Sequence, residues 1–272
     1  MIRLRADTEH VRLTLRRREI EAVFRDVPDD AFEDALELGA GDGAQSKLIA
    51  RCAGEVLCTD LNRERLVQEP HPRIAYDICN AENLPYETGR FDLIYSSNLL
   101  EHLRDPARAL SEMRRVLRDD GVMVHVVPNR FWKLLHMALF YPNLALSAVE
   151  AALSGGRVRY QNGKPSRGNN LRRERSSFLR RNIWPPVHGE YAGHLAEFTR
   201  MGSSSWRQMF KEAGLEPTGM VRGLPAHSPY RFGMNAPRKL CESMGLSSCN
   251  GYVLTKTGAK STKASILAGP IA

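Results

Sequence analysis

The sequence predicts an α/β protein with a doubly wound, mostly parallel sheet that carries helices on both faces. Between residues 32 and 129, short apolar runs typical of buried strands alternate with stretches of helical periodicity. The first apolar run, DALEL at 34–38, leads directly into a turn with three glycines, GAGDG. Strands that alternate with helices form parallel sheets, which bind ligands beyond the carboxyl ends of their strands.

The elements of this first half follow one another closely. After the strand at 34–38 we expect a helix at 44–52, and then the remaining strands of this half at 55–60, 73–78, 91–97 and 121–127. The segment 106–121 is predicted to be an amphipathic helix, with Pro106 at its start and Gly121 just past its end. Its apolar face is formed by Ala109, Met113, Val116 and Leu117.

The second half has a different pattern. Residues 130–153 have a helical and apolar pattern, with a break near Pro142, whereas residues 154–190 lack periodicity and are predicted to be a mobile loop. Regular structure is expected to return with a helix at 203–214, a strand at 216–223, a short helix at 236–245 and a strand at 250–257.

We therefore expect one domain over residues 1–257. Its expected parts are an N-terminal helix in 1–30, a cofactor-binding core at 31–129, an insertion at 130–190 that acts as a substrate lid, the C-terminal part of the sheet at 191–257, and a disordered tail at 258–272.

Composition limits the class of protein. A chain of 272 residues that is 42% hydrophobic can bury one large core. The five cysteines form no C-x-x-C pair and have no histidine partner at metal-ligand spacing, so we expect neither disulfides nor a metal site. Scattered reduced thiols and an N-terminus without the apolar core of a signal peptide favour a cytoplasmic location.

Residues 131–153 are too interrupted by polar residues for a membrane span, although contact with the inner face of a membrane remains an alternative.

The net charge of +8 comes from one segment. Residues 157–181 hold nine arginines and lysines and a single acid, Glu174. Such a loop suits a phosphate-bearing substrate, RNA phosphates, or simply a solvated surface.

The glycine turn has two interpretations. Gly39, Gly41 and Ala44 satisfy the G-x-G-x-x-A pattern of dinucleotide sites, and Asp60 lies 21 residues after Gly39, where a ribose would be held. Glu37, however, stands two residues before the first glycine. A carboxylate there would repel a diphosphate and attract an ammonium group, which disfavours a nicotinamide-dependent oxidoreductase.

The motifs together resemble the class I S-adenosylmethionine-dependent methyltransferases, in particular the small-molecule, type 11-like branch. The resemblance rests on ELGAGDG, on Asp60 and on residues 80–129, including the LEH sequence that follows the fourth strand. It covers residues 30 to 130 and implies a seven-stranded Rossmann-like sheet whose last strand is antiparallel, with S-adenosyl-L-methionine as cofactor.

The resemblance also implies residue roles. Glu37, Gly39 and Gly41 would surround the methionine part of the cofactor, and Asp60 would bind the ribose hydroxyls. The adjacent Leu61 is also expected to contact the cofactor. Asn80 and Ala81 would contact the adenine, where the family usually has aspartate in place of Asn80, and Asn98 would lie near the sulfonium. Two alternatives remain: Glu37 could bind backbone donors of a nearby loop, and Asp60 could cap a helix.

Methyl transfer from a sulfonium is an in-line displacement, so a general base is optional. His194, just before the FT turn, is the first candidate for the base, and His102 is the second. Each could instead be structural, with His194 capping a helix and His102 packing within its own. His188 is a further candidate, and Trp184 and Tyr191 could form walls of the substrate site.

The acceptor is predicted to be small or lipid-linked, with O-methylation in cell-surface glycan or natural-product biosynthesis as the favoured reaction. Relatives with the VPN strand end and the H-x-x-E-F turn, here VVPN and HLAEF, are the basis of this analogy. Two alternatives are an RNA-modifying methyltransferase that uses the basic insertion, and a protein that binds cofactor or nucleic acid without chemistry.

Overall fold

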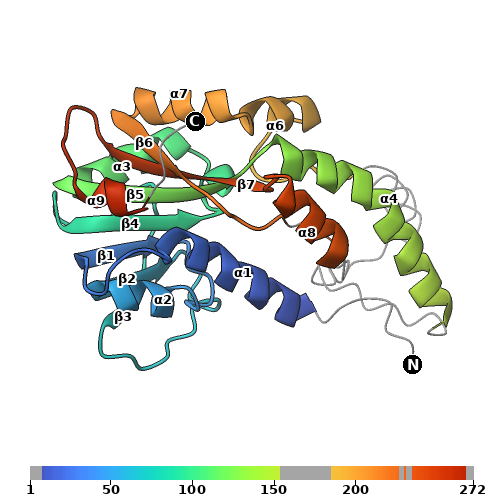
Figure 1. The fold of residues 1–272 in the computed structure, drawn as a ribbon, viewed down its shortest axis with the longest axis horizontal. Helices are drawn as coiled ribbons and strands as arrows, with labels where there is room; N and C mark the ends of the chain where they lie inside the picture. The colour runs from blue at the N-terminus through green and yellow to red at the C-terminus, as the bar shows by residue number, and fades with distance from the viewer. Residues whose placement is uncertain (1–7, 154–184, 227–229, 231–234, 268–272) are drawn as a thin grey trace, which may run out of the picture.

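The computed structural model describes residues 8–153, 185–226, 230 and 235–267 (Figure 1). One seven-stranded sheet runs through the molecule in the order β3-β2-β1-β4-β5-β7-β6. Its strands are β1 (Phe32–Leu38), β2 (Ala53–Asp60), β3 (Ile74–Ile78), β4 (Phe91–Ser97), β5 (Leu117–Pro128), β6 (Leu215–Val221) and β7 (Cys249–Lys256). Strands β1 to β5 pair in parallel, and β7 is antiparallel to both β5 and β6. The predicted fold class, including the antiparallel last strand, is confirmed.

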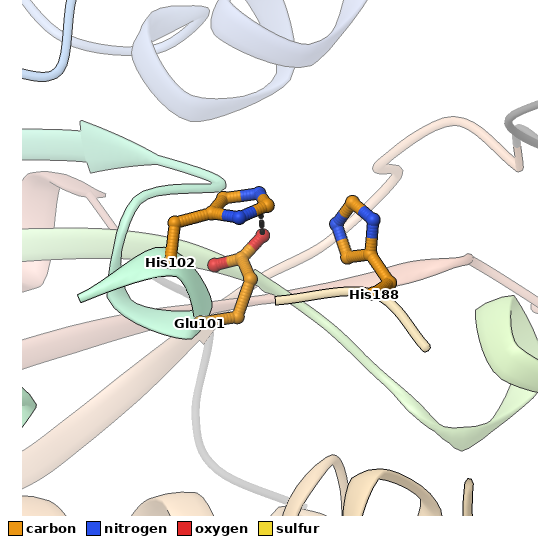
Figure 2. Close-up of side chains that lie close together, drawn as sticks. All are labelled: Glu101, His102 and His188. Atoms are coloured by element: carbon orange, nitrogen blue, oxygen red, sulfur yellow. Dashed lines mark ion pairs between the residues drawn. The ribbon is translucent and has the colours of Figure 1, made fainter. Parts of the chain in front are cut away.

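Helices cover both faces of this sheet (Figure 1). They are α1 (Thr8–Phe24), α2 (Ser46–Cys52), α3 (Pro106–Val116), α4 (Arg130–Leu153), α6 (His194–Arg200), α7 (Ser203–Glu212), α8 (Asn235–Ser243) and α9 (Lys263–Leu267). A single turn, η1 (Leu100–His102), follows β4, and its last two side chains are drawn in Figure 2. Apolar residues of α1, α2 and α9 form one buried cluster and those of α3 and α7 form another, so the sheet has a core on each side.

Helix α3 ends earlier than the sequence predicts. Its start agrees, because Asp105 caps it by accepting the Arg108 backbone N–H at 2.9 Å and Pro106 takes the first position. Strand β5 begins at Leu117, and Gly121 lies inside that strand. The pairing register between β4 and β5 shifts between Phe91 and Leu93, so a bulge absorbs the residues that we expected to finish the helix.

Helix α4 continues through Pro142, where the sequence predicts a break. Proline removes one hydrogen bond from a helix, but Pro142 is exposed, and water can satisfy the carbonyl that loses its partner. Within the residues that the structure describes, no helix is long and apolar enough to cross a membrane.

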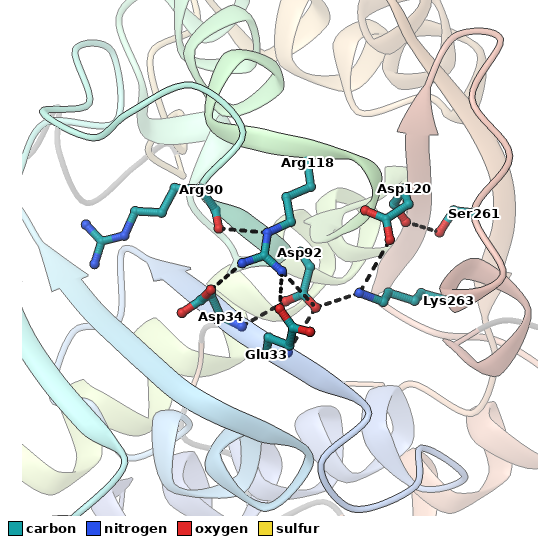
Figure 3. Close-up of polar contacts among 8 residues, drawn as sticks. All are labelled: Glu33, Asp34, Arg90, Asp92, Arg118, Asp120, Ser261 and Lys263. Atoms are coloured by element: carbon teal, nitrogen blue, oxygen red, sulfur yellow. Dashed lines mark hydrogen bonds and ion pairs between the residues drawn. The ribbon is translucent and has the colours of Figure 1, made fainter.

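The C-terminal tail is ordered further than predicted. Helix α9 lies within the segment expected to be disordered, and its Leu267 is buried in the core. Figure 3 shows the polar contacts that hold it: Lys263 Nζ lies 2.6 Å from the buried carboxylate of Asp92, which also accepts the backbone N–H groups of Glu33 and Asp34. The prediction of disorder rested on the polar composition of this segment, whereas the acid that anchors it, Asp92 of β4, lies 171 positions away in sequence.

Candidate active site

A cleft of about 990 Å³ opens beyond the carboxyl ends of β1, β2 and β4. The glycine turn, the residues after β2 and β3, the residues after β4, and the segment around His188 all contribute to its lining. Of the predicted cofactor residues, those that line it are Gly39, Gly41, Asp60, Leu61, Asn80, Ala81 and Asn98. A parallel sheet is expected to bind its ligand at this edge.

The glycine turn is shaped by positions that only glycine occupies easily. Gly39 and Gly41 have φ angles of +70° and +62°, in the left-handed region. A β-carbon on Gly39 would lie 2.9 Å from Cδ1 of Leu99, so a side chain there would also meet the segment after β4. The backbone can therefore approach a ligand closely at this turn.

Asp60 connects β2 to the glycine turn. One of its carboxylate oxygens accepts the Gly41 N–H at 2.9 Å, and the other accepts the Asn62 N–H at 2.8 Å. The side chain is buried but lines the cleft. These two bonds hold the carboxylate in place, while its remaining lone pairs can accept hydroxyl groups of a ligand.

Glu37 does not line the described cleft. It lies beneath the glycine turn, where its carboxylate accepts a hydrogen bond from the Ser46 hydroxyl at the start of α2. Burial raises the pKa of Glu37 to about 7, although the bond from Ser46 opposes the rise. In this structure Glu37 therefore supports the turn from below.

Asn80 and Asn98 occupy the two sides of the cleft. The side-chain oxygen of Asn80 accepts the Glu82 N–H at 3.0 Å, a bond within the loop between β3 and β4. Asn98 has a φ of +49°, and its amide donates to the Ser97 hydroxyl at 3.0 Å. A non-glycine residue in the left-handed region is uncommon and is often found at functional sites.

Helix α1 also contributes to the cleft, which its sequence does not predict. Arg16 of α1 lines the cleft, and its guanidinium donates to Ser97 Oγ at 2.5 Å and to Glu19 at 3.1 Å. Glu19 is buried and also contacts Ser97. The basic run at 16–18 is the one feature of the sequence that could have suggested a ligand-binding role for α1, and the acids that follow it reduce its net charge.

The other end of the cleft holds ionisable groups from two segments (Figure 2). Glu101 and His102 belong to η1, and His102 Nε2 lies 3.8 Å from Glu101 Oε1. The His188 ring lies 4.6 Å from the rings of both His102 and Trp132, centroid to centroid. Of these residues His102, Trp132 and His188 line the cleft. Burial raises the pKa of Glu101 to about 8, and burial together with Arg65 lowers the pKa of His102.

His194 lies in a different cluster. Its Nδ1 is 2.9 Å from Nζ of Lys133, which forms an ion pair with Glu197. The side chains of Lys133 and Glu197 are 0% exposed and join α4 to α6. Neither His194 nor Tyr191 lines the cleft, so of the three histidines predicted as candidate bases the structure brings His102 and His188 to it. Trp184 and the basic segment 157–181 lie outside the described residues.

The arrangement separates two kinds of chemistry. One end offers backbone groups and a fixed carboxylate, which suits a ligand with hydroxyls and an amino-acid moiety. The other end offers imidazoles and a carboxyl group, which can bind a cation or move a proton. The segment after β4, with Asn98 at its start and His102 at its end, connects the two.

Comparison with known proteins identifies a methyltransferase domain in this chain. Residues 36–125 match the family model described as a methyltransferase domain. A Mycobacterium tuberculosis protein named as a probable S-adenosylmethionine-dependent methyltransferase is 33% identical over 105 residues, which cover 38% of this chain and 38% of that protein. The ubiquinone/menaquinone biosynthesis C-methyltransferase of Ralstonia pickettii is 31% identical over 113 residues, 38% of this chain and 46% of that protein. The chain thus matches less than half the length of these relatives.

Solved structures agree on the fold. A Listeria monocytogenes structure assigned as an S-adenosylmethionine-dependent methyltransferase has a TM-score of 0.51 at 16% identity, covering 89% of this chain and 99% of that chain. A chain of the Haloferax volcanii complex between the methyltransferase activator Trm112 and an assigned methyltransferase has a TM-score of 0.54 at 13% identity, covering 92% of this chain and 95% of that one. Such low identities establish a shared fold alone.

Proposed function

From the premise that residues 36–125 form a class I S-adenosylmethionine-dependent methyltransferase domain, we propose that this protein transfers a methyl group from S-adenosylmethionine to a small acceptor. The observation that carries the proposal is the cleft that joins the glycine turn and Asp60 at one end to His102 and His188 at the other. Its volume of about 990 Å³ is enough for a cofactor and a small second ligand.

The residues at the turn end account for cofactor binding. Gly39 and Gly41 let backbone N–H groups approach the amino-acid moiety, and Asp60 accepts hydrogen bonds from the ribose hydroxyls. Asn80 and Ala81 lie beyond the next strand, where the adenine would contact them. Glu37 acts by holding Ser46 and the start of α2, so that its role in binding is indirect.

The residues at the other end account for acceptor binding. When bound, the cofactor supplies a methyl group on a sulfonium, which an acceptor atom displaces in line. His102 and His188 lie where an acceptor hydroxyl would be held, and the Trp132 ring forms an apolar wall beside them. We assign His102 as the predicted histidine that contacts the acceptor, and His194 as a residue that supports α4 and α6.

We further propose that the reaction is an O-methylation of a small or lipid-linked acceptor. The imidazole and carboxyl groups favour a hydroxyl acceptor because its oxygen must lose a proton, whereas an already nucleophilic carbon would need no such group. Helix α4, whose Trp132 lines the cleft, also carries exposed apolar residues, among them Leu134 and Tyr141, which offer a surface for the apolar part of a lipid-linked acceptor.

Two measurements test the proposal in turn. Titration calorimetry with S-adenosylmethionine and with its demethylated product should give a dissociation constant of about micromolar for a folded sample. Incubation with pools of sugar-linked and lipid-linked hydroxyl compounds should then release the demethylated cofactor and yield products heavier by one methyl group. The absence of cofactor binding would refute the function, while binding without turnover on any pool would refute only the choice of acceptor.

A further inference from the structure

We propose that Glu101, His102 and His188 together bind a divalent transition-metal ion at the acceptor end of the cleft. This inference rests on the proposed function, which assigns this end of the cleft to the methyl acceptor. No metal site was predicted from the sequence, because that prediction relied on cysteines and histidines at the short spacings typical of metal ligands. These three residues come from two segments of the chain, and His188 lies 86 positions after His102.

The ligand atoms already lie near one another. One nitrogen of each imidazole and one carboxylate oxygen of Glu101 are all within 4.8 Å of each other. In Figure 2 the two rings and the carboxylate face a common space between the turn η1 and the segment that carries His188. Metal–ligand bonds of about 2.0–2.2 Å require the ligand atoms to approach further, which side-chain rotations at His102 and His188 can provide.

Glu101 is the unusual member of the group. Its side chain is 0% exposed, and among the described residues neither of its oxygens has a hydrogen-bond partner. Buried polar groups are normally satisfied, and a buried carboxylate is costly unless a cation pairs with it. A metal ion between Glu101 and the two imidazoles would supply that pairing.

The main chain holds the two ligand segments together without the metal. The Glu190 N–H donates to the Glu101 carbonyl at 3.1 Å, which places His188 opposite η1. On its other side the His188 ring packs against Trp132 of α4, itself buried. The backbone positions of the two ligand segments are therefore fixed without the metal, and only the side chains of His102 and His188 must rotate to bind it.

The ligand set indicates the class of metal. Two imidazoles and one carboxylate suit Zn²⁺, Fe²⁺, Co²⁺ or Ni²⁺, whereas Mg²⁺ and Ca²⁺ prefer oxygen ligands alone. Three protein ligands leave coordination positions open, and His102 and His188 both line the cleft. An acceptor oxygen could occupy such a position and become more acidic there. An ammonium group of an acceptor would pair with Glu101 but would leave the two imidazoles without a role.

Cobalt provides a direct probe, because Co²⁺ bound to protein nitrogen and oxygen ligands absorbs visible light. The full chain, treated with a chelator and then dialysed, should bind one equivalent of Co²⁺ with a saturable change in its visible spectrum, and Zn²⁺ should displace it. His188→Ala and Glu101→Gln should each weaken binding by at least about tenfold. His71→Ala, which removes a histidine that does not line the cleft, should leave it unchanged.

The same samples separate this inference from the function on which it rests. Each variant is also titrated with the demethylated cofactor, which should bind as it does to the unchanged protein. The metal site is refuted if Co²⁺ fails to bind, or if all three variants bind it equally while the cofactor still binds. Loss of cofactor binding in the unchanged protein would instead refute the proposed function.

Discussion

Gly189 lies against Glu101 so closely that a β-carbon at position 189 would come within 2.3 Å of the Glu101 carbonyl oxygen. Its φ of +75° is also one that other residues rarely adopt. This contact sets the distance between the segment that carries His188 and the turn that carries His102. Two short segments, distant in sequence, thereby form one end of the cleft.

Gly189→Ala should displace His188 and lower acceptor turnover. The new methyl group cannot be accommodated against a backbone carbonyl, so the Glu190–Glu101 hydrogen bond must lengthen or break. We expect a loss of stability of about 1–3 kcal/mol and a larger fall in turnover than in cofactor affinity. Gly193→Ala is the matched control, because nothing lies within 4 Å of a β-carbon there and its φ of 173° suits any residue. Equal effects of the two substitutions on stability and turnover would show that the close contact at Gly189 does not position His188.

Asp60→Asn should weaken cofactor binding while the fold persists. The amide retains one acceptor oxygen but loses the charge that strengthens hydrogen bonds to hydroxyl groups. We expect a loss of about 1–3 kcal/mol in binding free energy, measured by calorimetry with the demethylated cofactor. Asp77→Asn is a suitable control, because Asp77 lies in the neighbouring strand β3 and accepts the Tyr86 hydroxyl at 2.8 Å without lining the cleft. An unchanged affinity in Asp60→Asn would assign Asp60 to the turn alone.

Much of this site follows from local sequence. Gly39, Gly41 and Asp60 lie in the cleft because strand ends and the turns that follow them are encoded by adjacent residues. Asn98 and His102 could be predicted for the same reason, since both follow β4 within a few positions. Such residues need only the correct strand order, and alternation of strands and helices provides it.

The remainder depends on contacts between distant segments. Arg16 reaches the cleft only because α1 packs on the sheet, and its partner Ser97 lies 81 positions away. Lys263 orders the tail through Asp92, which is 171 positions away. Glu37 was predicted to surround the methionine part of the cofactor, and in the structure its carboxylate accepts a hydrogen bond from Ser46, 9 positions away at the start of α2. No periodicity in a single sequence identifies these pairs.

Glu37→Gln should remove part of the pH dependence of stability. Burial raises the pKa of Glu37 in the folded protein to about 7, above its ordinary value of 4.5, so the folded state binds the proton more tightly than the unfolded state. The stability that this proton gives is present in full below pH 4.5 and is lost as the pH rises through 7, by about 3 kcal/mol in total.

Urea denaturation of both proteins between pH 4.5 and 8.5 measures this effect. The difference in unfolding free energy between the glutamine variant and the unchanged protein should shift in favour of the variant as the pH rises. Because other buried acids are common to both proteins, their contributions cancel in the difference. Parallel curves over the whole range would contradict a raised pKa at Glu37.

His194→Ala should retain most of the methyl transfer that His102→Ala loses. His194 bonds to Lys133 outside the lining of the cleft, whereas His102 lies in it. Whether His102 removes the acceptor proton itself or holds the metal ion that makes the acceptor more acidic, its loss should lower the rate. A general base contributes about 10²- to 10⁴-fold, so we expect a fall in that range for His102→Ala and of less than about tenfold for His194→Ala. Steady-state rates with a saturating acceptor decide between the two histidines. A larger loss for His194→Ala would restore it as the base.

Removing Lys133 alone should destabilise the protein, whereas removing Lys133 and Glu197 together should restore much of the lost stability. Both side chains are 0% exposed and connect α4 to α6, and one oxygen of Glu197 has no partner among the described residues. Lys133→Met leaves a buried carboxylate without its cation, which should cost about 3–5 kcal/mol of unfolding free energy. Adding Glu197→Leu removes that carboxylate, so the double variant should recover much of the loss even though it has one more substitution. Denaturation of the two single variants and the double variant tests this. A double variant less stable than Lys133→Met would show that the unpaired carboxylate of Glu197 is not costly, and would contradict the prediction.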